Sequence, residues 1–420
     1  RMTVTYNLDV SHSSTRGFLG LMLKWRGSLW KAICRQLILW SIAYFTISVI
    51  YRFVLPYDAQ TTFNYLAEYL SKGIDSYIPL TFMLGFFVSF VVGRWGSILN
   101  GIGWIDNAAM GFASYIKGGD EDTRMLRRTL VRYMVLTQAL VLRDISLQVR
   151  KRFPSLILLE PAGLVTHEEI QILKKDNDKY GRYWAPLQWC YHLVVKARTD
   201  GKIPSDHLLG RIAAEIQNFQ LGLATLIKYD WVPVPLVYPQ LIFISVRIYF
   251  VLCLISRQFL RDDKFDIWIP VATMIQFIVF MGWVKVGEML LNPLGDDDDD
   301  LECNHVIDKN LTAGFIIVER TEDKLPSLKK DIFWEQDQIA PLYTVKASKR
   351  FVHPLVGSAA GLNLLKDSTS VTMVPHGAVT ANMDPAERRT YTRIINLEKP
   401  HDARTDPEAQ GLVVARTHDE

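Results

Sequence analysis

The sequence predicts an all-α, polytopic membrane protein with four transmembrane helices and a large helical region outside the bilayer. Two observations carry this prediction. Segments outside the apolar runs, such as 127–153 and 206–229, show helical periodicity together with many charged side chains. Runs of about 20 mostly apolar residues, the length that crosses a bilayer, occur four times, at 36–55, 74–93, 232–256 and 267–291.

Composition excludes several classes of function. The 420 residues are 49% hydrophobic and carry a net charge of only +3, so no broad positive field exists and we expect no nucleic-acid partner. No phosphate-binding loop, zinc-protease motif or serine-hydrolase motif occurs, so no enzyme is predicted. Widely spaced cysteines argue against a disulfide framework or a structural zinc site; these are Cys34, Cys190, Cys253 and Cys303.

Charge next to the first apolar run predicts the membrane orientation. Only Asp9 opposes the basic residues there, which are Arg16, Lys24, Arg26, Lys31 and Arg35. The positive-inside rule therefore predicts a cytosolic N-terminus, and four crossings return the C-terminus to the same side. Residues 56–73 are interpreted as the loop between the first two spans. We expect a multi-pass protein of the plasma membrane, in contact with membrane lipid.

The expected organisation follows from these segments. The parts are a cytosolic N-terminal segment (1–30), the first two transmembrane helices (31–100), a cytosolic helical domain (101–230), the last two transmembrane helices (231–292), an acidic segment with a helical extension (293–345), and a C-terminal tail (346–420). The distal tail is polar with few aromatic residues, which is typical of disorder.

The second apolar run contains a patterned helix face. Ser76–Pro79 predicts a helix start, because proline is tolerated in a first turn. Ile78, Phe82 and Phe86 then follow at intervals of four and share one face. Such a face usually packs against helices or lipid, but around a pore it would form a constriction that gates by dewetting. The helix start at Tyr77 and Pro79 would favour anions.

Five consecutive aspartates, Asp296–Asp300, follow the fourth apolar run. A block of like charges is most often a solvated face. In a helical turn, however, side chains three apart converge, so Asp297 and Asp300 could share one cation while Asp298 and Asp299 face away. Hard oxygen ligands suit Ca²⁺, whose coordination would also need backbone carbonyls. Both interpretations stay open on the residues alone.

Several long stretches, in order from residue 2 to about 340, resemble animal bestrophins. They include MTVTY (2–6), WRGS (25–28), IPLTFMLGFFVS (78–89), RRTLVRY (127–133), YDWVPVPLVY (229–238) and GWVKVGEMLLNPLGDDDDDLE (282–302). The resemblance implies a calcium-activated channel for chloride and other monovalent anions, built as a homopentamer around one axial pore. A calcium-responsive membrane scaffold that regulates other channels is the alternative.

The resemblance also implies roles for individual residues. The pore neck corresponds to Ile78, Phe82 and Phe86. A calcium clasp would take side-chain ligands from Asp297 and Asp300 and backbone carbonyls from Ser11, Met289 and Asn292, with Ser11 coming from a distant part of the assembly.

Two further expectations rest on departures from the family pattern. The second, cytosolic aperture corresponds to His207, where relatives carry a small apolar residue. A ring of histidines would be polar, and histidine ionises near about pH 6.5 in water, so we expect this aperture to be wider in effect or pH-sensitive. The segment 346–358 is expected to act as an autoinhibitory belt.

Overall fold

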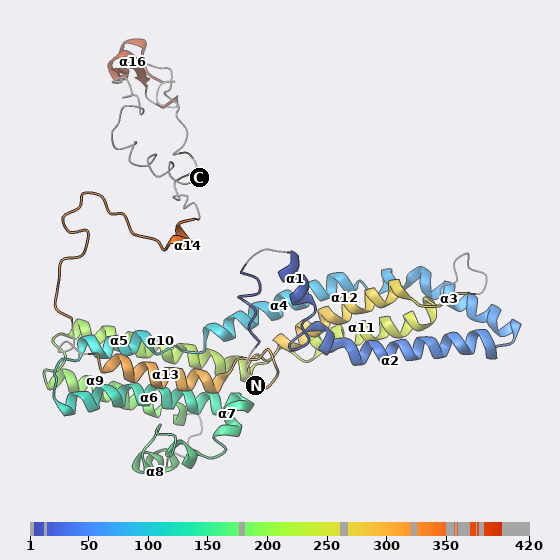
Figure 1. Ribbon diagram of the computed structural model, residues 1–420, viewed down its shortest axis with the longest axis horizontal. Coiled ribbons are helices and arrows are strands. Elements are labelled where there is room, and N and C mark those ends of the chain that lie inside the picture. Colours follow the sequence, from blue (N-terminus) through green and yellow to red (C-terminus); the bar gives the residue numbers. More distant parts are fainter. Residues whose placement is uncertain are drawn as a thin grey trace. The chain divides into compact units, whose positions relative to one another are not determined.

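The computed structural model describes residues 4–11, 15–175, 181–260, 268–320 and 326–349, together with parts of 357–396 (Figure 1). The chain divides into two compact units, Arg1–Ser327 and Leu328–Glu420. Two separate hydrophobic cores lie inside the first unit. We call the two groups of helices around them the membrane bundle and the helical domain.

The membrane bundle consists of helices that surround one core. They are α2 (Leu29–Val49) with a π-helical turn (Ile50–Val54), α3 (Tyr57–Tyr77), α4 (Leu80–Asn100), α11 (Val237–Ser256) and α12 (Val271–Leu290). The short helix α1 (Thr15–Met22) precedes them. The helical domain contains α5 (Asp106–Tyr115), α6 (Glu121–Ile145), α7 (Leu147–Arg152), α8 (His167–Lys175), α9 (Ala185–Thr199), α10 (Asp206–Trp231) and α13 (Cys303–Val318), with 3₁₀ turns at Leu156–Leu159 and Gly181–Tyr183.

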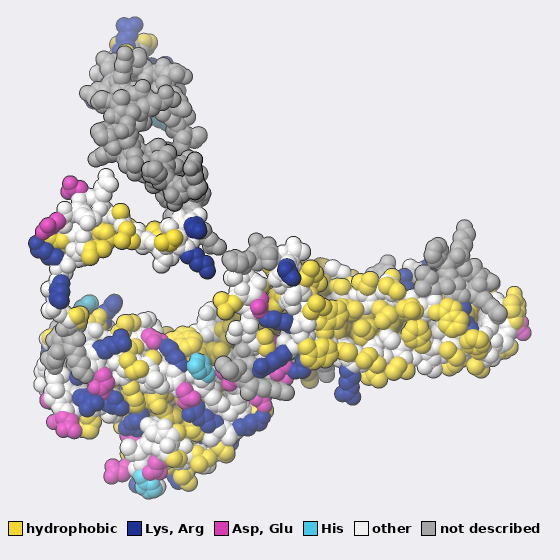
Figure 2. Space-filling view, in the orientation of Figure 1, with side chains coloured by type: hydrophobic (Ala, Val, Ile, Leu, Met, Phe, Trp, Pro, Cys, Tyr) yellow, Lys and Arg dark blue, Asp and Glu magenta, His cyan; other side chains and the backbone are white. Residues whose placement is uncertain are grey.

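Four helices of the bundle are long and apolar enough to cross a membrane. They are Leu29–Val54, Leu80–Asn100, Val237–Ser256 and Val271–Leu290, which confirms the predicted four spans and the all-α class. Hydrophobic side chains cover the visible face of this bundle, whereas charged side chains are dispersed over the helical domain (Figure 2). An apolar outer surface of this extent suits lipid rather than water.

The segment that connects the first two spans contains a helix, α3, which the sequence analysis did not predict. In α3 the buried positions Gln60, Ala67 and Ile74 recur every seven residues and form one stripe, and α3 packs along α11. The corner into α3 is tied by the Gln60 amide, which donates to the carbonyl of Tyr51 at 3.1 Å. The hydropathy of this segment is too low to indicate a membrane span, but buried positions that recur every seven residues are typical of a helix.

The second span begins later than predicted, at Leu80 instead of near Ser76. Ile78 ends α3 in an extended conformation (φ −127°, ψ 90°), and Pro79 caps α4. Proline lacks an N–H and its ring disfavours a helical conformation in the residue before it, so the chain breaks here into two helices. Ile78 therefore lies in the break and not on the helix that carries Phe82 and Phe86.

The membrane bundle meets the helical domain where α4 reaches α10. A Cβ on Gly101 would lie 2.9 Å from the carbonyl oxygen of Gly222, and a Cβ on Gly222 would lie as close to that of Gly101. The two backbones therefore touch with no side chain between them. About two turns earlier, Arg94 donates to the carbonyls of Tyr229 and Val232 and stacks 4.7 Å over the Tyr229 ring.

The core of the helical domain surrounds α6, which packs against α9 and α13. Arg132 on α6 forms two hydrogen bonds, of 2.6 and 2.7 Å, with Glu169 on α8, and the Tyr133 hydroxyl donates to the same carboxylate at 2.7 Å. Burial raises the pKa of Glu169, but hydrogen bonds from Arg132, the Thr166 N–H and Tyr133 outweigh it and lower that pKa to about 2. This carboxylate fastens α8 to the core.

The second unit is described by itself. It contains an extended stretch from Leu328, the short helix α14 (Val345–Ser348), the helix α16 (Pro385–Tyr391), and two antiparallel strands, β1 (Ser370–Met373) and β2 (Arg393–Asn396). Most of the expected belt at 346–358, and residues 397–420 of the expected disordered tail, lie outside the described residues.

Replacing Glu169→Gln is expected to lower the free energy of unfolding of the helical domain by about 2 kcal/mol, because Arg132 keeps its charge but loses a charged acceptor. The folded-state pKa of Glu169 lies below its ordinary value of 4.5. The contribution of the ionised Glu169 to the free energy of unfolding is therefore complete above pH 4.5 and disappears as the pH falls toward 2. Thermal unfolding in detergent measures the difference. Glu168→Gln, at the exposed neighbouring position, is the control, and equal melting temperatures for the two variants would contradict the assignment.

Candidate functional site

The acidic loop, residues 292–302, connects the end of α12 to the start of α13. The Leu301 N–H donates to the carbonyl of Pro293 at 2.9 Å and closes the loop. The amide of Gln148, on α7, donates to the carbonyls of Gly295 at 2.7 Å and Leu301 at 3.2 Å. The loop is thus fastened to the helical domain while it continues directly from the last membrane helix.

The loop is also fastened to the first membrane helix. Asp298, only 8% exposed, forms an ion pair with Lys31 in the first turn of α2. Gly27 has a positive φ of 62°, and a Cβ there would lie 2.5 Å from an oxygen of Asp299. The chain therefore passes so close to the loop that only glycine fits. Sequence analysis expected Asp298 to face away from a cation shared by Asp297 and Asp300. It did not predict the ion pair, because Lys31 lies at the other end of the membrane region.

Asp300 is almost fully buried, with 5% exposed, and its Oδ2 accepts the Asp297 N–H at 2.7 Å. Burial raises the pKa of Asp300, the Asp297 N–H lowers it, and the negative charges of Asp297, Asp299 and Asp296 raise it again. Its net pKa is above the ordinary value. The loop thus crowds negative charge around a carboxylate that has little contact with water.

The donor set of this loop fits a calcium ion. A Cβ on Gly295 would lie 2.6 Å from Asp300 Oδ2 and 3.4 Å from the carbonyl oxygen of Asn292, so both oxygens face the same small space. Met289 lines the cavities of about 230 and 270 Å³ on either side of the loop. A carboxylate combined with backbone carbonyls is the ligand type that Ca²⁺ takes.

Other predicted ligands are less closely gathered. Asp297 is exposed and lines the larger of these two cavities, whereas Asp300 lines the smaller. Ser11 donates its hydroxyl to the carbonyl of Leu8 at 2.9 Å, and its segment meets the loop at Val4, whose N–H donates to the carbonyl of Asp298 at 3.3 Å. Among the described residues, no group of three or more His, Cys, Asp or Glu side chains is arranged as a metal cluster.

A row of phenyl rings lies on α4. Phe82 and Phe86 are 65% and 61% exposed, with ring centroids 4.7 Å apart, and Phe90 continues the row one turn later. Sequence analysis did not include Phe90, although its spacing extends the same pattern. The opposite side of α4 is buried against the bundle, including Leu84 and Phe87. This chain therefore leaves the predicted neck face of α4 uncovered.

Of the remaining predicted residues, Pro79 and His207 lie at helix starts, whereas Tyr77 ends a helix, so the prediction of a helix start at Tyr77 was wrong. Tyr77 is exposed at the end of α3, and Pro79 caps α4, whose first N–H, from Leu80, donates to the carbonyl of Ile78 at 2.8 Å. His207 is exposed in the first turn of α10, which Ser205 caps by accepting the Leu208 N–H.

Three charged residues inside the last two membrane helices pair with one another. Glu288 on α12 forms ion pairs with Lys285 on the same helix and with Arg247 on α11, the latter at 3.3 Å. Pairing is the usual arrangement of ionisable residues in membrane spans. This cluster lies close to the acidic loop, because Lys285 and Glu288 line the same cavity as Asp298.

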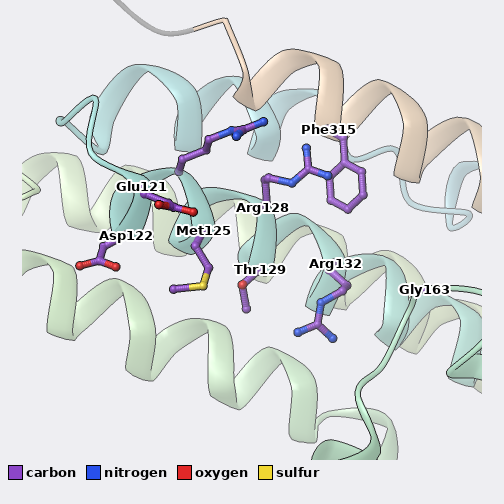
Figure 3. Close-up of a pocket in the computed structure, with 9 residues that line it drawn as sticks. Glu121, Asp122, Met125, Arg128, Thr129, Arg132, Gly163 and Phe315 are labelled. Carbon is purple, nitrogen blue, oxygen red and sulfur yellow. The ribbon is translucent and has the colours of Figure 1, made fainter.

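A larger cavity of about 760 Å³ lies over α6 in the helical domain (Figure 3). Arg124, Arg128 and Arg132 line it at successive turns, and Arg128 lies 4.1 Å over the Phe315 ring. Glu319 pairs with the first two arginines, as Glu169 does with the third. These arginines link α6 to neighbouring segments, and their charge is balanced by carboxylates.

The acidic loop and the row of phenyl rings are joined by packing between α12 and α4. Trp95 on α4 lines the smaller cavity together with Asp300. Farther along, a Cβ on Gly287 would lie 2.6 Å from the Phe87 ring. Phe87 is fully buried and meets Tyr238 and Phe243 edge to face. Its ring therefore cannot move aside to accept an additional methyl group at position 287.

Replacing Gly287→Ala is expected to lower the melting temperature of the protein, because overpacking of this kind costs about 1–3 kcal/mol. Gly93→Ala on α4 is the matched control, since a Cβ there meets no atom within 4 Å. Thermal unfolding of both variants in detergent, followed by size-exclusion chromatography, measures the effect. A Gly287 variant as stable as the Gly93 variant would show that the two helices are not in tight contact.

Comparison with known proteins identifies the family. The profile of a family described as "Bestrophin, RFP-TM, chloride channel" matches residues 2–320. Bestrophin homolog 22 of Caenorhabditis elegans is 53% identical over 414 residues, which covers 94% of this chain and 83% of that protein. Bestrophin homolog 15 of the same organism is 42% identical over 425 residues, covering 96% of this chain and 80% of that protein.

A solved structure supports the fold. The crystal structure of a bacterial bestrophin homolog from Klebsiella pneumoniae matches with a TM-score of 0.52 at 17% identity, covering 68% of this chain and 98% of the other. The family profile and the relatives confirm the resemblance seen in the sequence motifs. The chain is therefore a multi-pass membrane protein that belongs to the bestrophin family, a family described as chloride channels.

Proposed function

We propose that this chain is one subunit of a calcium-activated channel for chloride and other monovalent anions, assembled as a homopentamer around one axial pore. One observation carries the proposal. The acidic loop contacts the first membrane helix, the last membrane helix and the helical domain at once. A ligand bound in this loop therefore acts on both parts of the subunit. The chloride-channel description of the family supports the transported ion.

Calcium would be held by the carboxylates of Asp297 and Asp300 and the backbone carbonyls of Met289 and Asn292, with Ser11 contributed by another part of the assembly. When bound, the ion supplies positive charge to a loop whose carboxylates repel one another. The raised pKa values of Asp299 and Asp300, due first to burial and then to neighbouring aspartates, support this. The chain's own contribution is to hold these oxygens around the space beside Gly295.

The exposed rings of Phe82 and Phe86 would form the neck of the pore together with Ile78 from the preceding break. In a ring of five subunits, such faces make an apolar constriction that excludes water and ions until it widens. The start of α4, at Pro79, would favour anions through its helix dipole. His207, exposed on α10, is the proposed second constriction.

Coupling between loop and neck would pass through α12 and α4. Trp95 shares a cavity with Asp300, and Phe87 is wedged against Gly287. Close-packed contacts of this kind transmit small shifts because the interior resists compression. Cation binding that orders the loop would thus bias α4 toward one of two positions. Both termini are proposed to lie in the cytosol and the protein in the plasma membrane, in agreement with the basic residues before α2.

Replacing Asp300→Asn is expected to raise the calcium concentration for half-maximal anion current by roughly tenfold or more, because affinity follows ligand charge. Gly295→Ala should shift it in the same direction, since the added methyl group would meet Asp300 Oδ2 at 2.6 Å. Asp296→Asn removes an equal charge from an exposed position paired with Lys151 and is the control. Bilayer recordings of purified protein provide the measurement. Equal shifts for Asp296 and Asp300 variants would indicate a general charge effect instead of a site.

Replacing Phe82→Ala is expected to increase current at low calcium, because a smaller side chain widens and wets the neck. Leu66→Ala, at an exposed apolar position on α3, is the control and should leave gating unchanged. The same recordings separate the alternatives. A calcium-responsive scaffold that regulates other channels predicts no current from purified wild-type protein at any calcium concentration, which would refute the channel.

A further inference from the structure

The segment 15–31, formed by α1 and the residues before the first turns of α2, has a surface that the fold leaves uncovered. None of the residues of α1 is buried. Large apolar side chains stand out from it, with Phe18 47%, Leu19 55%, Met22 62%, Leu23 82% and Trp25 60% exposed. Exposed apolar side chains gathered in one short segment, on α1 and just after it, indicate a contact surface.

The same segment is strictly basic. It contains four basic residues and no acidic one, the basic residues being Arg16, Lys24, Arg26 and Lys31. Lys24 and Lys31 pair with aspartates of this chain, so the positive charge that α1 itself presents is the exposed Arg16. A partner that fits α1 therefore combines an apolar layer with negative charge. The cytosolic face of a bilayer that contains anionic phospholipid has both, and basic amphipathic helices bind it through buried apolar area and electrostatic attraction.

The position of α1 is set by the first membrane helix. The segment leads without interruption into α2 at Leu29, and the Trp30 indole N–H donates to the carbonyl of Met22 at 2.7 Å. α1 runs across the direction of α2 at the end of the bundle (Figure 1). A helix that is bound to the end of a membrane span, and whose axis runs across the axis of that span, lies at the depth of the headgroups.

We propose that α1 and the residues that follow it form an interfacial membrane-binding element, which inserts its apolar side chains at the headgroup level and takes an anionic phospholipid surface. The element is linked to the acidic loop through Lys31 and Gly27, and to the N-terminal segment through Lys24. Lys24 pairs with Asp9 of the N-terminal segment, and Lys31 pairs with Asp298. Gly27 touches Asp299 between these two pairs. Lipid composition thereby bears directly on the position of the loop.

The test places one fluorophore on the full-length protein reconstituted in vesicles. Cys34 is the partly exposed cysteine and the other three are buried, so Cys34→Ser provides the background. Leu19→Cys labels α1, and Leu147→Cys labels α7 in the helical domain as the matched control, because both leucines are 55% exposed. Phospholipids that carry a nitroxide just below the headgroup quench any label that lies in that layer. The readout needs no ion current, so it is independent of the proposed channel function.

We expect strong quenching of the label at position 19, little at position 147, and a rise in quenching at 19 when phosphatidylserine is added to phosphatidylcholine. Arg16→Gln should reduce the lipid-dependent docking equilibrium about fivefold, since one basic residue near the surface is worth roughly that factor. Arg211→Gln, exposed on α10, should leave it unchanged.

Three results would overturn the proposal. Equal quenching at positions 19 and 147, or quenching at 19 that ignores both phosphatidylserine and Arg16→Gln, removes the anionic surface as the partner. A label at 19 that is protected from lipid nitroxides and equally from aqueous iodide would show that a second copy of the chain covers α1 instead.

Discussion

Asp298 carries a negative charge that has almost no contact with water, and Lys31 is its partner. A carboxylate in such surroundings is tolerated only when it is paired and hydrogen-bonded. The pair joins the residues after the last membrane helix to the first turn of the first one. It therefore closes the membrane bundle at one end, and it decides where the acidic loop lies relative to α2. The approach of Gly27 to Asp299 and the bond from Val4 to Asp298 depend on that same closure.

The loop is anchored on its other side as well. The side-chain amide of Gln148 donates to two carbonyls of the loop. The backbone carbonyl of Gln148 accepts a hydrogen bond from the side-chain amide of Asn304 at 3.4 Å. The ion pair with Lys31 and the hydrogen bonds from Gln148 thus make the loop a connection between the membrane bundle and the helical domain. Its crowded carboxylates are the part of this junction whose energy changes most with bound cations, because like charges in poor contact with water repel strongly.

Local chemistry explains most of what could be predicted from the sequence. The four spans follow from length and hydropathy, and Ser28, Asp120 and Ser205 cap their helices through local side-chain bonds. The row of Phe82 and Phe86 follows from spacing alone. Proline chemistry also predicted a helix start near Pro79, although it was placed a few residues early.

Features that depend on distant partners could not be predicted in this way. The burial of Asp298 requires Lys31, which is 267 positions away in the sequence. The helix α3 has too many polar residues to resemble a span, and its stripe of buried residues acquires meaning only against α11. Ile78 was assigned to a helix face because its spacing fits, yet the conformation demanded by Pro79 removes it from that helix.

The backbone contact between Gly101 and Gly222 has a mechanical consequence. Because no side chain separates the two backbones there, α4 cannot move closer to α10. No layer of side chains lies between them that could rearrange while one helix slides along the other. Rotation about this point is the motion that remains. In the proposed gating, the contact would act as the pivot of α4, with Trp95, beside the acidic loop, nearer to it and Phe82 farther from it. A small displacement at the loop would arrive at the rings enlarged in proportion to the two distances from the pivot.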